Sequence, residues 1–301
     1  MKDKAKAGFT LTELLVVIAV IGLLGSIIFA ITRGAGEQGR IAKGLYFSQH
    51  LHNSLGSYAA GIWNFDEGSG ATANDTSGWG NNGTLVNIPT WRCVSTDAGY
   101  TPSGQGCSLE FNGSSQYVNA GNNTSLNIIS EITVEAWIYF VEQIGSNPSI
   151  VTKARNGCVN ADWSYMSFAI GTQNSSSKIR YGTNGTSFYS NTTLAFDNWY
   201  HLVLVAQNGQ NHLYVNGSLD STNSRDFTQS SSEQDLVIGT RKCDGTVPAG
   251  YHYTGLIDEV RIYAISLTSS QIQSRYYAGL DKLLVKGQIT QEEYKERVKN
   301  V

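Results

Sequence analysis

The feature that most constrains this chain is an apolar run near its N-terminus. Leu14 to Ile31 are 18 consecutive residues without a charge. At a rise of ~1.5 Å per residue, a helix of this length spans ~27 Å, close to the hydrocarbon thickness of a bilayer. A helix buried in a soluble core is rarely apolar on every side. The run therefore predicts one transmembrane helix.

The residues that flank this run distinguish a retained anchor from a secretory signal peptide. A signal peptide carries a small-residue cleavage site after its apolar stretch, but Arg33 and several glycines follow here, with no A-x-A pattern. A basic leader and the sequence GFTLTE at 8–13 precede the run. This segment resembles the prepilin motif of type IV pilins and pseudopilins, from the first residue to about residue 57. The resemblance implies cleavage after Gly8 by prepilin peptidase and N-methylation of Phe9.

Glu13 has a physical role on this interpretation. A carboxylate at the end of an apolar span is costly unless it is paired. Cleavage after Gly8 leaves a cationic amine on Phe9, and in a packed filament Glu13 of one subunit can pair with this amine on its neighbour. Other pilin subunits would then be partners of the chain. The alternative is a glutamate among lipid headgroups at the start of an ordinary anchor helix.

The charges of the leader predict how the chain crosses the membrane. Lysines at positions 2, 4 and 6 stay on the cytoplasmic side, so the C-terminal bulk lies outside. We expect a leader at 1–8 and an assembly helix at 9–57, in which apolar residues recur at helical spacing from Ile41 to Leu55. The chain is thus predicted to be a single-pass inner or cytoplasmic membrane protein with an extracytoplasmic C-terminal domain.

Between Gly61 and Tyr263 the pattern changes to short strands and tight turns. The chain holds 32 glycines and only 4 prolines, which suits many short strands joined by turns. In Ile132–Phe140, alternate residues fall on opposite faces of a strand. No long helical pattern interrupts the region, so we expect an antiparallel β-sandwich. A formal net charge of −3 gives no indication of nucleic-acid binding.

Several segments of this region resemble bacterial laminin-G-like, concanavalin A-like jelly rolls. They are GIWNFDEGSGATANDTSGWGNNGTL at 61–85, LEFNGSSQYVNAG at 109–121 and GLIDEVRIYAISLTSSQI at 255–272. The resemblance covers 61–272. It implies a mainly β jelly-roll sandwich, preceded here by one long N-terminal transmembrane helix and followed by short C-terminal helices. It implies no particular ligand, because this fold hosts enzymes, lectins and structural modules.

Four cysteines, at positions 93, 107, 158 and 243, bear on the compartment of the domain. None has the CxxC spacing of zinc or thioredoxin sites. Outside the cytoplasm two disulfides are expected. Of the three pairings, Cys93–Cys107 is favoured because it closes a short glycine-rich loop, and Cys158–Cys243 then follows by elimination. The alternative is that all four are buried free thiols.

A metal site is the first candidate function of the sandwich. The loop DTSGWGNNG at 75–83 is rich in oxygen ligands and in glycine, as calcium sites are. The resemblance implies one structural Ca²⁺ between this loop, through Asp75 and Asn81, and Asp258 of the last strand. The alternative is that the side chains of the loop only shape a turn.

Catalysis is a weaker hypothesis. Related glycosidases carry two catalytic carboxylates on one strand. The nearest candidates are Glu131 and Glu135, which share a face but lack an intervening aspartate. Asp258 and Glu259 are adjacent, so we expect them to point to opposite faces of their strand. We therefore expect no enzyme, although a membrane-anchored carbohydrate-active enzyme remains an alternative.

Aromatic residues in predicted loops are candidates for glycan or protein contact. Trp163 and Tyr165 are the pair we select, and the alternative is that they cap the core. Residues 280–301 form a separate tail, in which TQEE at 290–293 is a capping box that opens a helix. We expect a helical hairpin that either docks on the sandwich or awaits a partner.

The combined prediction is a type IV pilin-like surface subunit that displays a laminin-G-like domain for adhesion or for binding a glycan or a surface protein. The alternative is a minor pseudopilin of a type II secretion or DNA-uptake system.

Overall fold

The computed structural model describes residues 55–93, 106–145, 147–159, 163–173, 176–225, 227, 234–285, 287 and 289–299. All of them lie in one compact unit, Phe47–Val301. The predicted membrane span, with Gly8, Phe9 and Glu13, lies outside the described residues. No helix within the described ranges is long and apolar enough to cross a membrane.

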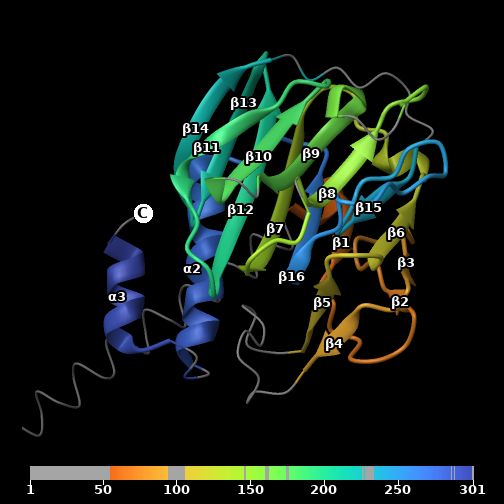
Figure 1. Ribbon diagram of the computed structural model, residues 1–301. Helices are drawn as coiled ribbons and strands as arrows, with labels where there is room; N and C mark the ends of the chain where they lie inside the picture. The colour runs from red at the N-terminus through yellow and green to blue at the C-terminus, as the bar shows by residue number, and fades with distance from the viewer. Residues whose placement is uncertain are drawn as a thin grey trace, which may run out of the picture. The chain divides into compact units, whose positions relative to one another are not determined.

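Two antiparallel sheets form the body of the domain (Figure 1). The first sheet has the order β14-β13-β12-β7-β16-β5-β4, with β1 also paired to β16. Its strands are β1 Ala59–Trp63, β4 Thr90–Arg92, β5 Ser108–Asn112, β7 Ile132–Phe140, β12 Asn198–Gln207, β13 Gln210–Val215, β14 Ser218–Ser224 and β16 Thr254–Tyr263.

The second sheet has the order β11-β10-β9-β8-β15-β6-β3-β2. Its strands are β2 Thr72–Ala73, β3 Gly83–Val86, β6 Tyr117–Gly121, β8 Ser149–Ala154, β9 Met166–Gln173, β10 Lys178–Thr183, β11 Phe188–Thr193 and β15 Leu236–Ile238. Three short 3₁₀ turns, η1 Gly56–Tyr58, η2 Thr124–Leu126 and η3 Trp163–Tyr165, lie in the connections. This mainly β, jelly-roll-like sandwich confirms the β part of the fold class expected from the sequence, whereas the N-terminal helix of that prediction lies outside the described residues.

The predicted alternation in β7 places one set of its side chains in the core between the sheets. Val134, Ala136, Ile138 and Phe140 belong to that core and are at most 1% exposed. The opposite face, which carries Glu135 and Trp137, is also buried. β7 is therefore covered on both sides, and the cover on its outer face comes from the C-terminal helices.

Two helices follow the sandwich, α2 Ser269–Val285 and α3 Gln291–Lys299. The capping box predicted for α3 is confirmed, because Glu293 donates its backbone N–H to Thr290 Oγ1 at 3.1 Å. α2 begins earlier than Leu280, where the sequence analysis placed the start of the tail. A second capping box explains this, since Gln271 N–H donates to Thr268 Oγ1 and Thr268 N–H donates to Gln271 Oε1.

The helical hairpin docks on the outer face of the first sheet. The Tyr276 ring stacks on Trp137 with centroids 5.8 Å apart, and both residues belong to an apolar cluster that also contains residues of α3. Tyr294 of α3 donates its hydroxyl to Asp281 of α2 at 2.8 Å. Of the two predicted roles for the tail, the structure shows the docked one.

Gly279 allows α2 to approach the sheet closely. A Cβ at this position would lie 2.4 Å from Cζ2 of the Trp137 ring. Gly279→Ala should therefore lower the free energy of unfolding by about 1–3 kcal/mol through overpacking, although alanine favours a helix by about 1 kcal/mol. Urea denaturation of a fragment starting at Leu55 measures this. Ser270→Ala, at an exposed position of the same helix, is the neutral control, and a stabilised Gly279→Ala variant would contradict the packing described.

Candidate functional site

The loop between β2 and β3 is organised around the carboxylate of Asp75. Its Oδ1 accepts hydrogen bonds from the backbone N–H groups of Ile62 and Ser77, both at 2.9 Å. Its Oδ2 accepts from the Ser77 hydroxyl at 2.8 Å and from Asn81 N–H at 2.9 Å. A carboxylate offers about four lone-pair positions, and these donors occupy them. The contacts are those of the turn-shaping alternative.

The other two predicted calcium ligands have different surroundings. Asn81 is buried and donates through Nδ2 to Ala60 O and Ser125 Oγ, while its Oδ1 has no hydrogen-bond partner among the described residues. Asp258 is fully buried and accepts from Glu259 N–H at 2.7 Å. Lys282 and Arg261 interact electrostatically with Asp258 and would oppose a further cation. The surroundings of Asp75 agree with the turn-shaping alternative, and calcium binding through Asp75, Asn81 and Asp258 stays a prediction.

A calcium-binding role and a turn-shaping role of Asp75 predict different effects of Asp75→Asn on the free energy of unfolding. If the carboxylate serves the turn, the substitution leaves donors facing an amide N–H₂ and should cost about 1–3 kcal/mol of unfolding free energy. The loss should be equal in calcium and in chelator. Glu142→Gln, at an exposed carboxylate, is the control. A loss that appears only when calcium is present would instead establish the metal site.

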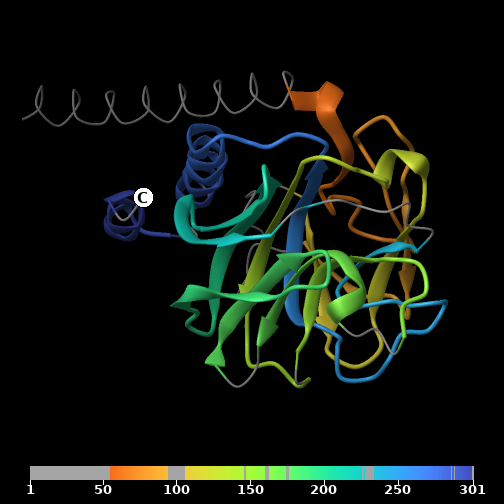
Figure 2. The ribbon, with the colours of Figure 1, turned by 90° about the horizontal axis from the view of Figure 1, so that it is seen from above.

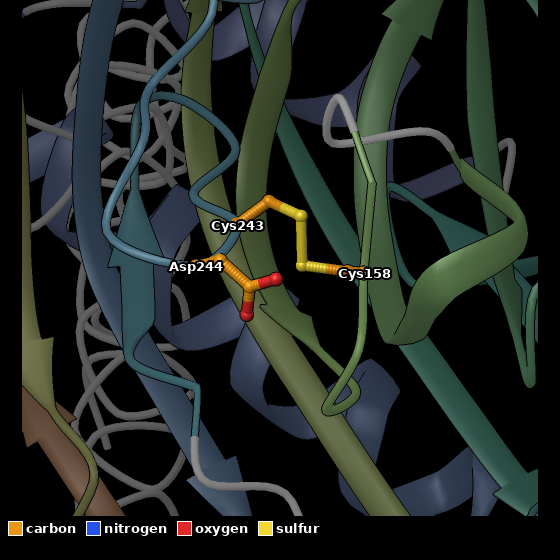
Figure 3. A group of neighbouring side chains, drawn as sticks. All are labelled: Cys158, Cys243 and Asp244. Atoms are coloured by element: carbon orange, nitrogen blue, oxygen red, sulfur yellow. A yellow bond between two sulfur atoms is a disulfide. The ribbon is translucent and has the colours of Figure 1, made fainter.

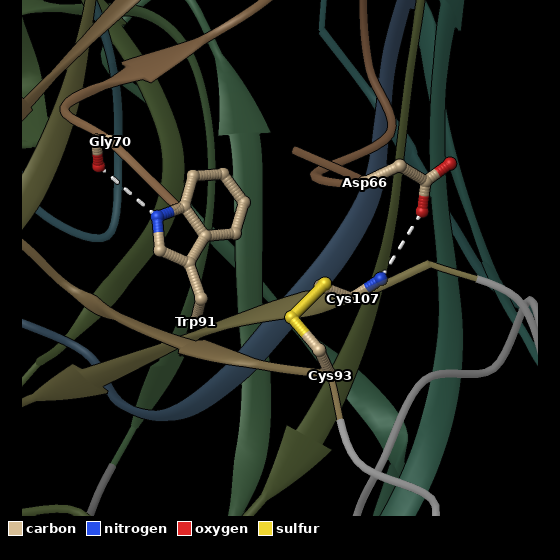
Figure 4. The surroundings of a disulfide bond; sticks show 5 residues. All are labelled: Asp66, Gly70, Trp91, Cys93 and Cys107. Atoms are coloured by element: carbon tan, nitrogen blue, oxygen red, sulfur yellow. Dashed lines mark hydrogen bonds between the residues drawn. A yellow bond between two sulfur atoms is a disulfide. The ribbon is translucent and has the colours of Figure 1, made fainter. Parts of the chain in front are cut away.

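Two disulfides are present, in the pairing that the sequence favoured. Cys93 and Cys107 are 14 residues apart in sequence, and the backbone N–H of Cys107 also donates to Asp66 Oδ1 at 3.3 Å (Figure 4). Cys158 and Cys243 are 85 residues apart in sequence. Asp244 lies beside this second bond (Figure 3), and the three residues form a group of candidate metal ligands within 4.8 Å. Because both sulfurs are bonded to each other, only one carboxylate remains to bind a metal there.

Trp163, predicted as a contact residue for a ligand, lies in η3 but is not exposed to solvent. It is 3% exposed and donates through Nε1 to Thr186 O at 3.0 Å. The guanidinium groups of Arg180 and Arg241 lie over its ring, 4.3 and 4.9 Å from the centroid. The prediction of an open platform is therefore wrong for Trp163.

Trp163 is buried beneath the connections that the Cys158–Cys243 disulfide joins over the second sheet. It belongs to a small apolar cluster, separate from the core between the sheets, that contains Ala154, Cys158, Met166, Ala169 and Cys243. Tyr165 is half-buried and packs against the same cluster. The connections that carry Cys158 and Cys243 fold over β8 and β9 and are joined by the disulfide. Trp163 and Tyr165 thus pack within this cluster.

A buried charged network lies between β7, β12, β16 and α2, and sequence reasoning missed it. Glu135 is 1% exposed and pairs with Arg275 of α2, Nε to Oε2, at 2.6 Å. Its Oε1 lies 3.0 Å from His201 Nε2 and 3.5 Å from Arg261 Nη1. Glu131 is separate from this network and accepts from Ser266 N–H at 3.3 Å. The two nearest candidates for a catalytic pair therefore have structural contacts.

The network fixes the charge states of its members. Burial acts to raise the pKa of Glu135, but Arg275, Arg261 and the His201 hydrogen bond outweigh it and hold that pKa well below its usual range. Burial lowers the pKa of His201, against the opposing effect of Glu135. A carboxylate whose pKa is held low by the Arg275 guanidinium suits a fixed ion pair rather than a general acid.

A β-bulge corrects the expectation that Asp258 and Glu259 point to opposite faces. The register of β16 against β7 shifts between Asp258 and Arg261, and Glu259 has a φ of +52°, in the left-handed region. As a result Lys282 of α2 interacts with both carboxylates, lying 3.8 Å from Glu259 Oε1. Glu259 also pairs with Arg261. The bulge thus turns both acidic groups toward the helix.

Comparison with known proteins identifies both parts of the chain. Residues 112–273 match the family described as the concanavalin A-like lectin/glucanases superfamily, of laminin-G type. Residues 3–29 match the prokaryotic N-terminal methylation motif. No curated protein matches the chain in sequence.

Solved structures share the fold at low sequence identity. Trypanosoma rangeli sialidase in complex with the inhibitor DANA is 14% identical, with a TM-score of 0.54 over 79% of this chain and 38% of that chain. The receptor-binding domain of botulinum neurotoxin C/D mosaic serotype is 12% identical, with a TM-score of 0.53 over 75% and 52%. The binding domain of Paraclostridial Mosquitocidal Protein 1 is 15% identical, with a TM-score of 0.52 over 75% and 53%.

This chain therefore spans about half, or less, of the length of each of these three proteins. At such identities the likeness shows the fold alone. The family match extends over more than half of this chain, which also carries a prokaryotic N-terminal methylation motif. The chain therefore belongs to the concanavalin A-like lectin/glucanase superfamily.

Proposed function

We propose that the protein is a type IV pilin-like surface subunit that displays its sandwich outside the membrane to bind a glycan or a protein. The observation that carries this proposal is the methylation motif at residues 3–29 in the same chain as a concanavalin A-like domain. Prepilin peptidase would cleave after Gly8 and methylate Phe9. The apolar segment would then stay in the mature subunit and assemble with other pilin subunits.

The disulfides support an extracytoplasmic position. Bonds such as Cys93–Cys107 and Cys158–Cys243 persist in oxidising compartments and are rare in the cytosol. The lysines of the leader support the same side of the membrane. The disulfides and the leader charges thus both favour a domain outside the cytoplasm.

The proposed ligand surface lies in the loops rather than on a sheet face. α2 and α3 pack on β7, β12 and β16 of the first sheet, and the disulfide-joined connections around Trp163 cover β8 and β9 of the second. We propose a binding role without catalysis, because Glu135 is held in an ion pair with Arg275. A glycan array probed with the full-length protein tests for a glycan ligand, and binding to no glycan would leave a protein ligand as the proposal.

Glu13 tests the assembly part of the proposal. Glu13→Ala should leave the protein in the membrane, since it removes a charge from the end of an apolar span. It should reduce the yield of sheared filaments, because the pairing with a neighbouring Phe9 amine is lost. Glu142→Gln, on an exposed carboxylate of the sandwich, is the control. Normal filament yield from Glu13→Ala would leave only a membrane-anchored binding domain.

A minor pseudopilin is the second candidate, and the size of the domain favours a sparse position in a filament. Immunogold labelling of sheared filaments separates the two roles. Labels at filament ends indicate a tip adhesin, and labels along the length indicate a major subunit. Labels confined to the cell envelope indicate a pseudopilin of a secretion or DNA-uptake system.

A further inference from the structure

Lys153 on β8 is a lysine that the fold removes from water. It is fully buried, and its ammonium group donates to Asn122 Oδ1 at 2.7 Å and to the carbonyl oxygen of Gln234 at 2.8 Å. Both acceptors are neutral, whereas a buried charge is costly unless an opposite charge pairs with it. The two hydrogen-bond partners therefore do not neutralise the charge of this ammonium group.

Lys153 and Asn122 come from the ends of two strands that are not neighbours. β8 and β6 both pair with β15, in which Leu236 lies opposite Lys153 on one side and opposite Gly121 on the other. β6 ends at Gly121, which has a φ of +71°, and Asn122 follows directly. The Lys153 side chain thus reaches across β15. In Figure 2, as in Figure 1, this part of the second sheet lies away from α2 and α3.

The surroundings of Lys153 favour the neutral form of its amine. Burial lowers the pKa of Lys153 to about 8, although the nearby carboxylate of Asp235 acts to raise it. About a tenth of the chains then carry the neutral, nucleophilic amine at pH 7. Burial acts to raise the pKa of Asp235, but hydrogen bonds from Lys242 and Asn119 outweigh it and lower that pKa. Asp235 is therefore ionised and can accept the proton that Lys153 loses.

The carboxamide of Asn122 lies within reach of this amine. With an ordinary angle at the oxygen, a hydrogen bond of 2.7 Å to Oδ1 places Lys153 Nζ about 3.5 Å from Asn122 Cγ, since a C=O bond is ~1.23 Å long. Reacting atoms about 3–3.5 Å apart are close to an attack geometry. The fold thus holds a nucleophile beside a carbonyl carbon, with a proton acceptor nearby.

We propose that Lys153 and Asn122 form a modification site, at which they join in an intramolecular amide bond and release ammonia. Asp235 takes a proton from the Lys153 ammonium, and the neutral Nζ attacks Cγ of Asn122. The Cγ–Nδ2 bond then breaks as a second proton from Nζ passes to the leaving Nδ2. Asp235 returns the first proton to the ammonia. In total, an ammonium and a carboxamide become a secondary amide and an ammonium ion, with no oxidant or reductant.

This bond changes both the charge and the connectivity of the second sheet. It replaces a buried ammonium by a neutral amide, which removes the cost of an unpaired buried charge. It joins two residues that are 31 apart in sequence and closes the chain across β15. Unlike the two disulfides, an amide survives a reductant. The inference does not depend on the proposed function, because it concerns the sandwich alone.

Mass spectrometry of the full-length protein, purified in detergent and then reduced and denatured, tests the bond. We expect an intact mass that is one ammonia below the mass that the sequence requires. Trypsin with a protease that cleaves after glutamate gives the decisive peptides, since Asn122 then lies in fragment 111–131 and Lys153 in fragment 143–155. A branched peptide that joins the two fragments at these side chains is the expected result.

Separate, unmodified fragments would overturn the proposal, even if ammonia is lost elsewhere, as in succinimide formation at an Asn-Gly pair. This measurement uses the unmodified protein, so it does not depend on whether a variant folds. A leader that is retained or cleaved changes the mass of fragments from the N-terminus only, so failure of the proposed function is read separately.

Substitutions give an independent test of the residues involved. Lys153→Arg keeps a cation but cannot form the amide, so its mass should lack the ammonia deficit. Lys178→Arg, on β10 of the same sheet, is the matched control and should retain the deficit. Asp235→Asn should lower the linked fraction at least tenfold, because a positioned proton acceptor typically contributes a hundredfold or more. A deficit that persists in Lys153→Arg would overturn the amide, and an unchanged linked fraction in Asp235→Asn would overturn the role of Asp235.

Discussion

Replacing Glu135 by glutamine should lower the free energy of unfolding by about 3–5 kcal/mol. The carboxylate is fully buried and pairs with Arg275 and Arg261. An amide leaves the buried Arg275 guanidinium without this counter-charge, whereas Arg261 keeps its ion pair with Glu259. Urea denaturation of a fragment starting at Leu55 measures the loss, and the exposed Glu142→Gln is the control. A loss below about 1 kcal/mol, the value typical of a surface ion pair, would contradict the burial of this network.

The double variant Glu135→Leu with Arg275→Met separates charge burial from packing. Removing both partners of a buried ion pair in favour of apolar side chains is often neutral or stabilising. The double variant should therefore be more stable than Glu135→Gln alone. Equal losses in both would mean that the other contacts of Glu135, such as His201 at 3.0 Å, dominate.

The second large effect is expected from the Cys158–Cys243 disulfide. Its residues are 85 apart in sequence, and closing a loop of that length stabilises a fold by about 4–5 kcal/mol in the chain-entropy description. Changing both cysteines to serine should cost that amount and should also loosen the cover around Trp163. The same change at Cys93 and Cys107, 14 residues apart, should cost about 3 kcal/mol.

Thermal unfolding of the Cys93→Ser, Cys107→Ser variant with and without reductant isolates the Cys158–Cys243 bond. The part of the tryptophan fluorescence that a Trp163→Phe variant lacks should respond to reduction before global unfolding, because this bond joins the connections that cover the Trp163 indole. A Cys158→Ser, Cys243→Ser variant with unchanged stability and an unchanged spectrum would contradict that role.

Local patterns in the sequence predicted much of this fold. The period-two alternation of β7 placed Val134 and Ile138 in the core. The capping box at Thr290 opened α3 where expected. These features depend on residues close in sequence, so their physics is visible without the rest of the chain.

The features that sequence reasoning missed depend on contacts between distant residues. Glu135 and Arg275 are 140 residues apart, and nothing near Glu135 indicates that a helix covers it. Trp163 is buried because two distant connections are joined over the sheet. The bulge after Asp258 breaks the alternation that an ordinary strand would have. One signal was available, since TSSQ at 268–271 is a capping box that marks the early start of α2.

The N-terminus of the mature protein tests the central claim most directly. Protein sheared from the cell surface should give an intact mass and an N-terminal sequence that begin at N-methylated Phe9, without the leader that ends at Gly8. This result would show a processed pilin-type segment retained in front of a concanavalin A-like domain. A first residue beyond Ser26, as a signal peptide would leave, or an unprocessed Met1 would contradict it.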